Sequence, residues 1–175
     1  PRPLTVKLLE RPHLIERIRS LIADCDRAHL VPYNTTSLER DLALRLGIPM
    51  YGADPKFLPF GTKSGSRRLF VEEGIPHPAG RENIHSTAAA IDAIRAIRRE
   101  KPGVCQVIVK LNEAFSGEGN ALADLQGLPP PGAPDEASRI EERLRVMRCE
   151  LAGMRYETFC ERLERHGGVV EERIA

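Results

Sequence analysis

Residues 105–125 read CQVIVKLNEAFSGEGNALADL, and this stretch decides the fold. Its first part is rich in β-branched side chains and is followed by a polar loop, which predicts a buried strand over residues 105–111. A second strand is predicted over residues 121–125, just past Gly119-Asn120. The two strands should pair as a hairpin whose tip carries glycine.

Lys110 interrupts the first of these strands near its end. Burying an ammonium group costs free energy unless an anion pairs with it, and a phosphate group could be that anion. Glycines in the following loop, residues 116–120, would let backbone N–H groups approach phosphate oxygens without a Cβ in the way. The alternative is a surface hairpin with Lys110 extended toward water, and a short glycine loop alone does not decide between the two.

Two other segments carry candidate binding residues. Residues 61–68 (GTKSGSRR) open a predicted helix, and cations beside the free N–H groups of a helix N-terminus form a plausible anion site, although a solvated basic face is the alternative. The cations concerned are Lys63, Arg67 and Arg68. The other segment, residues 169–174 (VVEERI), places two adjacent carboxylates in a predicted final strand and by itself indicates only polar alternation.

The rest of the chain alternates helices with short strands. Apolar spacing and capping residues predict two short helices before about residue 23 and longer ones over residues 38–46, 62–73, 86–100, 135–149 and 156–166. In the helix over residues 62–73, Leu69, Phe70 and Val71 are expected to face inward. Residues 28–31 and 48–51 are predicted strands around an intervening helix, which together form a strand-helix-strand unit of the doubly wound type.

Composition excludes several classes of function. With 26 basic and 25 acidic residues, the chain has no net field that would attract nucleic acid or an anionic membrane, and neither is expected as a partner. No apolar run approaches the roughly 20 residues of a membrane helix. The 4 cysteines are far apart and lack CxxC spacing, which predicts reduced thiols in or near the core of a cytoplasmic protein. A dinucleotide-binding oxidoreductase is set aside, because no GxGxxG follows a strand.

Four segments taken together resemble the ATP-grasp superfamily, most closely its carboxylate-amine and peptide ligase branch. They are LALRLGIPMYGADP (42–55), GTKSGSRRLFVEEGIPHP (61–78), QVIVKLNEAFSGEGNAL (106–122) and VVEERI (169–174). Their order and separation are far more specific than any one of them. The resemblance spans roughly residues 34–174.

The resemblance implies an α/β (α+β) fold class, in which the end of a Rossmann-like pre-ATP-grasp domain precedes the N-terminal ATP-grasp subdomains. Residues 1–54 would end the Rossmann-like domain. Residues 55–103 would form a helical linker part of the ATP-grasp fold. Residues 104–175 would form the ATP-binding flap subdomain, which ends at the hinge strand.

The resemblance also implies residue roles. Lys63 and Lys110 resemble the two nucleotide-contacting lysines of the family, with Lys110 near the α-phosphate and the adenine edge as an electrostatic catalytic residue. Five residues resemble the mobile flap that closes over the phosphates, namely Ser116, Gly117, Glu118, Gly119 and Asn120. In the hinge, the Glu171 side chain and the Glu172 carbonyl would accept from the exocyclic amine of adenine, and the Ile174 amide would donate to the ring.

ATP and Mg²⁺ are the implied cofactors. Family members place a ribose-binding acid and the magnesium ligands beyond the hinge, so these positions would fall after Ala175 and no metal ligand is expected within the chain. Pro1 without an initiating methionine likewise suggests a piece of something longer. The chain by itself would carry about half a catalytic site and is expected to be inactive.

The implied reaction activates a substrate carboxylate as an acyl phosphate. An amine then attacks the acyl phosphate and displaces phosphate. Small-molecule carboxylates and amines are therefore the expected partners. The alternative, from a different class, is a non-catalytic nucleotide-binding or interaction module with the same fold. His77 and His85 are general-base candidates only by their position in the sequence, and a surface or capping role is favoured for each.

Overall fold

A computed structural model describes residues 2–114 and 117–174 of the chain. It divides into two compact units, Pro1–Pro59 and Phe60–Ala175. Among the described residues, no helix combines the length and the apolar character needed to cross a bilayer.

The first unit is a small helical assembly. Its helices are α1 (Leu4–Leu9), α2 (Pro12–Leu21), the 3₁₀ turn η1 (Cys25–Arg27) and α3 (Ser37–Leu46), and η2 (Pro55–Gly61) follows at its end. Ile15, Leu42 and Leu46 form the buried centre of this unit. The two short helices predicted near the start are confirmed, and α3 ends at Gly47 in a left-handed conformation, as expected for a helix-stopping glycine.

The strands predicted at residues 28–31 and 48–51 are much shorter than expected. They meet in a single parallel bridge between Leu30 and Met50. The Leu30 amide donates to the Pro49 carbonyl and the Tyr51 amide donates to the Leu30 carbonyl, both at 2.8 Å. Pro49 has no N–H group to extend the ladder, so the strand-helix-strand unit exists only in this minimal form.

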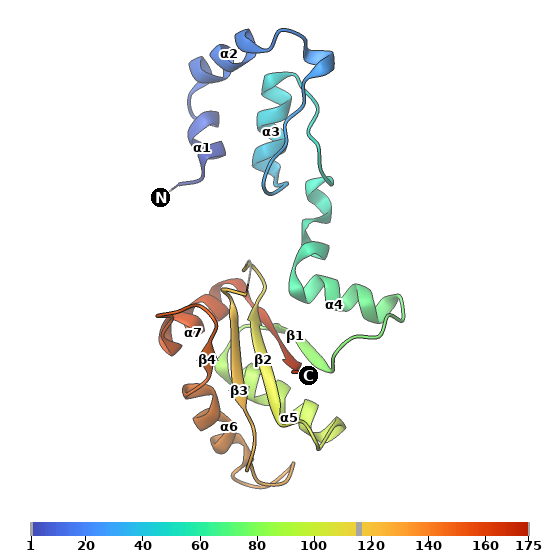
Figure 1. The fold of residues 1–175 in the computed structure, drawn as a ribbon, viewed down its shortest axis with the longest axis vertical. Helices are drawn as coiled ribbons and strands as arrows, with labels where there is room; N and C mark the ends of the chain where they lie inside the picture. Colours follow the sequence, from blue (N-terminus) through green and yellow to red (C-terminus); the bar gives the residue numbers. More distant parts are fainter. Residues whose placement is uncertain (1, 115–116, 175) are drawn as a thin grey trace. The chain divides into compact units, whose positions relative to one another are not determined.

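The second unit is built on a five-stranded antiparallel sheet with the order β1-β5-β2-β3-β4. The strands are β1 (Gly80–Ile84), β2 (Gln106–Leu111), β3 (Asn120–Asp124), β4 (Arg148–Cys149) and β5 (Gly168–Glu172). The predicted hairpin is confirmed, because β2 pairs with β3 from Gln106 opposite Asp124 to Lys110 opposite Asn120. The final strand is confirmed as β5 and lies between β1 and β2 (Figure 1).

Helices cover one face of this sheet and leave the other face of β2 and β5 for polar groups. These helices are α5 (Thr87–Glu100), α6 (Glu136–Arg145) and α7 (Tyr156–His166), whereas α4 (Lys63–Glu72) brings Arg67 to Glu171 on the opposite face. Apolar side chains of α5, α6 and α7 pack on alternate residues of β2, such as Val107 and Val109, to form the main core. Side chains alternate between the two faces of a strand, so Ile108 and Lys110 of β2 point away from this core.

Three expectations for this unit are wrong in part. In α4 the buried residues are Ser64, Gly65 and Arg67, whereas Leu69 and Val71 are exposed, so the inward face of the helix is polar. The helix predicted over residues 135–149 ends at Arg145, and the two-residue strand β4 follows it. Strand β1 was not predicted, because its sequence GRENI lacks the apolar alternation by which strands are recognised.

Candidate functional site

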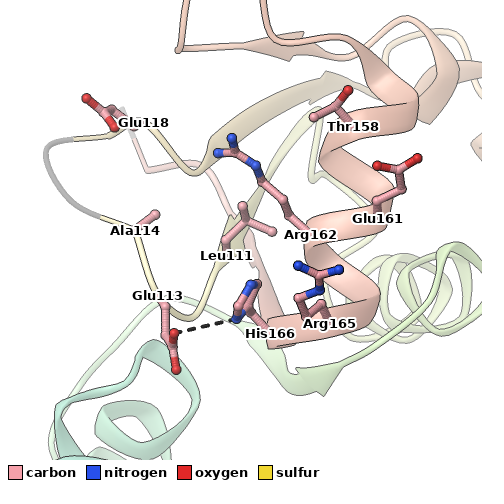
Figure 2. Close-up of a pocket in the computed structure, with 9 residues that line it drawn as sticks. All are labelled: Leu111, Glu113, Ala114, Glu118, Thr158, Glu161, Arg162, Arg165 and His166. Atoms are coloured by element: carbon pink, nitrogen blue, oxygen red, sulfur yellow. Dashed lines mark ion pairs between the residues drawn. The ribbon is translucent and has the colours of Figure 1, made fainter. Parts of the chain in front are cut away.

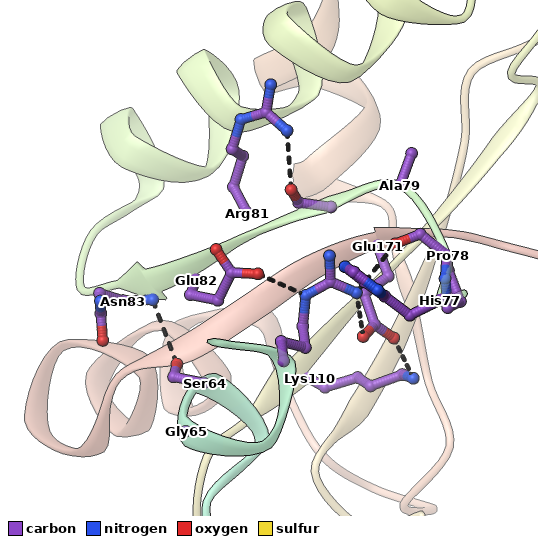
Figure 3. A network of polar contacts seen from close by, with 12 residues as sticks. Ser64, Gly65, His77, Pro78, Ala79, Arg81, Glu82, Asn83, Lys110 and Glu171 are labelled. Atoms are coloured by element: carbon purple, nitrogen blue, oxygen red, sulfur yellow. Dashed lines mark hydrogen bonds and ion pairs between the residues drawn. The ribbon is translucent and has the colours of Figure 1, made fainter. Parts of the chain in front are cut away.

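The candidate site centres on the carboxylate of Glu171, which is 7% exposed. Its Oε1 accepts from Nη1 of Arg67 at 2.8 Å, and its Oε2 forms an ion pair with Nζ of Lys110. Nε of Arg67 in turn donates to Oε1 of Glu82 at 2.7 Å (Figure 3). Two cations and two carboxylates from α4, β1, β2 and β5 thus form one charged network on the face of the sheet opposite the main core.

Strand register explains why Lys110 and Glu171 meet. In the β2–β5 pair, Ile108 lies opposite Glu171 and Lys110 lies opposite Val169. Because side chains two residues apart in a strand share a face, Lys110 and Glu171 are diagonal neighbours on the same side of the sheet. The sequence prediction named both residues as site residues but did not predict that they pair with each other.

Lys63 stands at the first position of α4, and its Nζ donates to the Ala114 carbonyl at the base of the glycine loop, at 3.2 Å. Burial lowers the pKa of Lys63, the positive charge of Lys110 lowers it further, and Glu171 opposes these effects. An additional anion near the two lysines would relieve their mutual repulsion. This is the physical reason to regard them as parts of one anion-binding site.

The carboxyl group of Glu171 is held in its charged form. Burial raises its pKa, but hydrogen bonds and charges from Lys110 and Arg67 outweigh burial and leave the pKa below its ordinary value. Glu171 is therefore a hydrogen-bond acceptor and not a proton donor at neutral pH.

The anion site expected at the N-terminus of α4 differs from the prediction. The Ser64 amide already donates to Oδ1 of Asn112 at 3.0 Å, and the Gly65 amide donates to Oγ1 of the N-cap residue Thr62 at 2.9 Å. Arg67 is committed to carboxylates rather than free to meet an anion. Of the cations in this segment, Lys63 is the one whose pKa is lowered by the charge of Lys110, after the larger effect of burial.

The glycine loop is described at Gly117, Glu118, Gly119 and Asn120, whereas the predicted flap residue Ser116 lies outside the described residues. The Gly119 carbonyl accepts from Leu111 and the Gly117 carbonyl accepts from Asn120, each at 2.8 Å. Within residues 2–114 and 117–174, no group accepts from the amides of Gly117, Glu118 or Gly119. The flap role expected for residues 116–120 stays a prediction.

The hinge residues lie at the end of β5. The Glu172 carboxylate pairs with Nζ of Lys101 at 2.5 Å and accepts from the Ala79 amide at 2.8 Å. These contacts use the Glu172 side chain and leave its predicted role, which belongs to its carbonyl, untested. Ile174 is 66% exposed beyond the end of the strand. The adenine contacts assigned to Glu171, Glu172 and Ile174 stay predictions.

A pocket that the sequence did not predict lies between residues at the glycine loop and residues of α7 (Figure 2). It has a volume of about 370 Å³ and is lined by Leu111, Ala114 and a set of charged and polar residues. That set is Glu113, Glu118, Thr158, Glu161, Arg162, Arg165 and His166. Its acidic and basic groups nearly balance, so the pocket has no charge preference comparable to that of the lysine pair.

The other titratable candidates do not form a second centre. Nδ1 of His77 contacts the Ile75 carbonyl at 2.7 Å, and Nδ1 of His85 contacts the Glu164 carbonyl at 3.4 Å. All four cysteines are free, and Cys25 and Cys105 are exposed rather than near the core as expected. In the part of the chain that the structure describes, no group of three or more His, Cys, Asp or Glu residues could hold a metal ion.

Gly80 makes room for the network. A Cβ atom at this position would lie 2.6 Å from the Val170 carbonyl oxygen and 2.8 Å from the guanidinium carbon of Arg67. We expect Gly80→Ala to lower the free energy of unfolding by about 1–3 kcal/mol, because Arg67 or the β1 backbone must shift. Urea denaturation measures this value. Gly103→Ala, where a Cβ would meet no atom within 4 Å, is the matched control, and equal stability of the two variants would contradict the packing described here.

The antiparallel sheet with helices packed on it has the fold of an ATP-grasp protein. Residues 58–173 match the family model described as IQCH-like, ATP-grasp. The chain belongs to this family. The fold class expected from the sequence, mixed α/β of the ATP-grasp type, is confirmed.

Individual relatives agree with this assignment. IQ motif-containing protein H of Danio rerio is 27% identical over 132 residues, which is 74% of this chain and 12% of the relative. L-propargylglycine--L-glutamate ligase of Streptantibioticus cattleyicolor is 26% identical over 175 residues, which is 98% of this chain and 34% of the relative. The chain therefore spans about a third or less of these curated relatives.

A solved structure supports the same fold. D-alanyl-alanine synthetase A from Vibrio cholerae O1 biovar eltor superposes with a TM-score of 0.50 at 14% identity, over 84% of this chain and 38% of that chain. The chain thus forms an ATP-grasp ligase-like region. The three-part domain division expected from the sequence stays a prediction, and the structure itself separates two compact units.

Proposed function

We propose that this chain binds ATP on the face of the sheet that carries Lys63, Lys110 and Glu171. The observation that carries the proposal is the contact of Lys63 Nζ with the Ala114 carbonyl, at 3.2 Å, at the base of a loop whose amides at residues 117–119 have no acceptor among the described residues. Burial and the charge of Lys110 both lower the pKa of Lys63 there. A polyphosphate supplies the negative charge that this arrangement lacks.

In this proposal each group has a distinct task. Lys63 and Lys110 bind phosphate oxygens, and the amides of Gly117, Glu118 and Gly119 cover them, with Ser116 and Asn120 as the flanking flap residues. Glu171 accepts from the exocyclic amine of adenine. The Glu172 carbonyl and the Ile174 amide complete the base site, and none of these residues holds magnesium.

We further propose that the full-length protein is an ATP-dependent carboxylate-amine ligase. A substrate carboxylate oxygen attacks the γ-phosphorus, and the bond from the γ-phosphorus to the β,γ-bridging oxygen breaks. The products of this step are an acyl phosphate and ADP. An amine nitrogen then attacks the acyl carbon, loses a proton and expels phosphate. Lys110 contributes by stabilising negative charge on the phosphates, and magnesium would supply further charge neutralisation when bound.

The substrate class follows from the relatives. The Streptantibioticus relative joins L-propargylglycine to L-glutamate by its name, and the solved relative is named for alanyl-alanine synthesis. Amino acids are therefore our first choice for both the carboxylate and the amine. A cytoplasmic location, where ATP and free amino acids occur together, stays a prediction.

ATP binding is expected to slow hydrogen exchange at the described flap amides of Glu113, Ala114 and residues 117–119 by about tenfold or more, because phosphate oxygens become their acceptors. Mass-spectrometric exchange on the full-length protein with and without ATP and magnesium measures this effect. Amides of α6, on the covered face of the sheet, serve as the control. Exchange that is slow without ATP, or unchanged by it, would make the segment a structural hairpin tip.

A second candidate function is a non-catalytic nucleotide-binding or interaction module. The match to the IQCH-like family and to IQ motif-containing protein H favours it, because neither description names a ligase. Phosphate release by the full-length protein with ATP, magnesium and a mixture of amino acids separates the two candidates. Release that depends on amino acids favours the ligase, whereas ATP binding without release favours the module.

A further inference from the structure

Arg67 is a buried cation to which the proposed function gives no task. It is 4% exposed, although arginine is seldom buried without a specific reason. Its Nε donates to Oε1 of Glu82 at 2.7 Å, and its Nη1 donates to Oε1 of Glu171 at 2.8 Å and to the Pro78 carbonyl at 3.0 Å. The planar guanidinium is thus fixed by three hydrogen bonds to three different acceptors.

These contacts fix Glu171 at both oxygens. Arg67 pairs with Oε1, and Lys110 of the neighbouring strand β2 pairs with Oε2. An ionised carboxylate offers about four lone-pair sites, so acceptor capacity remains after these two contacts. What the carboxylate has lost is the freedom to rotate away from the face of the sheet.

A fixed, ionised carboxylate discriminates between ligand groups. It attracts a hydrogen-bond donor such as an exocyclic amine, and it repels a carbonyl oxygen at the same position. The discrimination depends on the carboxylate keeping both its place and its charge. Burial alone would raise the pKa of Glu171, and hydrogen bonds from Lys110 and Arg67 keep that pKa below its ordinary value.

We propose that Arg67 is a positioning residue that sets the base specificity of the nucleotide site, by holding the Glu171 carboxylate where it selects a purine with an exocyclic amine. The inference rests on the proposed function, because Arg67 acts only if a nucleotide binds on this face. Arg67 itself contacts no nucleotide. In the proposal Lys110 is shared between the phosphates and Glu171, whereas Arg67 makes its contacts, to Glu82, Glu171 and the Pro78 carbonyl, within the protein.

The test compares ATP with inosine triphosphate, which carries a carbonyl oxygen where ATP carries the exocyclic amine. Calorimetric titration of the full-length protein should show that the wild type prefers ATP. Arg67→Met should lower the affinity for ATP by about tenfold and leave that for inosine triphosphate within about twofold, because the inosine base makes no favourable contact with Glu171. Arg99→Met, at an exposed position of α5, should change neither affinity.

The outcomes separate the inference from the proposed function. If the wild type binds neither nucleotide, the proposed function fails and the inference fails with it. If the wild type prefers ATP and Arg67→Met weakens both nucleotides equally or neither, Arg67 is only structural and the proposed function stands. If circular dichroism shows that Arg67→Met does not fold, Arg67→Lys decides. The single ammonium group of lysine cannot reproduce the planar guanidinium of arginine. A preference of Arg67→Lys for ATP over inosine triphosphate that is about threefold below the wild-type preference therefore supports the inference, and an unchanged preference overturns it.

Discussion

Replacing Lys110 with alanine is expected to weaken ATP binding by about 2 kcal/mol or more, because a charge-assisted hydrogen bond to phosphate is lost from a half-buried site. The fold should survive, since Glu171 keeps its contact with Arg67 at 2.8 Å. Calorimetric titration of the full-length protein with ATP and magnesium measures the change.

A surface lysine provides the control for this experiment. Lys7→Ala alters an exposed residue of α1 in the other compact unit and should leave the affinity unchanged. Circular dichroism of Lys110→Ala establishes that the variant is folded. Equal affinity of the folded variant and the wild type would remove Lys110 from the nucleotide site, and the flap would then be left as the main support for binding on this face.

The largest expected effect on stability comes from a buried ion pair away from the nucleotide site. Glu136 at the start of α6 is 1% exposed and pairs with Arg98 of α5, which is 5% exposed. Arg98→Met should lower the free energy of unfolding by about 3–5 kcal/mol, because it keeps the aliphatic stem but leaves a buried carboxylate without its main countercharge. Urea denaturation of the chain measures this loss.

The contacts that Glu136 keeps in Arg98→Met determine where the loss of unfolding free energy falls in that range. Glu136 keeps the Gly132 amide at 2.9 Å and Nε of Arg95 at 3.4 Å, so the lower end is expected. Arg99→Met, at the adjacent exposed position of α5, should cost no more than about 0.5 kcal/mol. Adding Glu136→Gln to Arg98→Met should cost less than the sum of the single changes, because the two groups interact. A loss below about 1 kcal/mol for Arg98→Met would show that the pair is not a structural clamp.

Features that depend on neighbouring residues could be predicted from the sequence. The hairpin of β2 and β3 follows from β-branched alternation around a glycine loop, and the bounds of α7, Tyr156–His166, follow from its apolar spacing. Thr62 caps α4 as predicted. Each of these depends on hydrogen bonds or periodicity within a few residues of the chain, which the local sequence specifies.

Features that depend on residues far apart in the chain were decided by the tertiary structure. Arg67 and Glu171 are 104 positions apart, and only the placement of β5 beside β1 and β2 brings them together. The same contact explains why α4 turns a polar face inward, against the usual expectation that Leu69 and Val71 would be buried. Lys110 was recognised from its sequence as a cation in need of an anion, but its partner in the protein is Glu171, because strand register rather than residue type determines which charges meet.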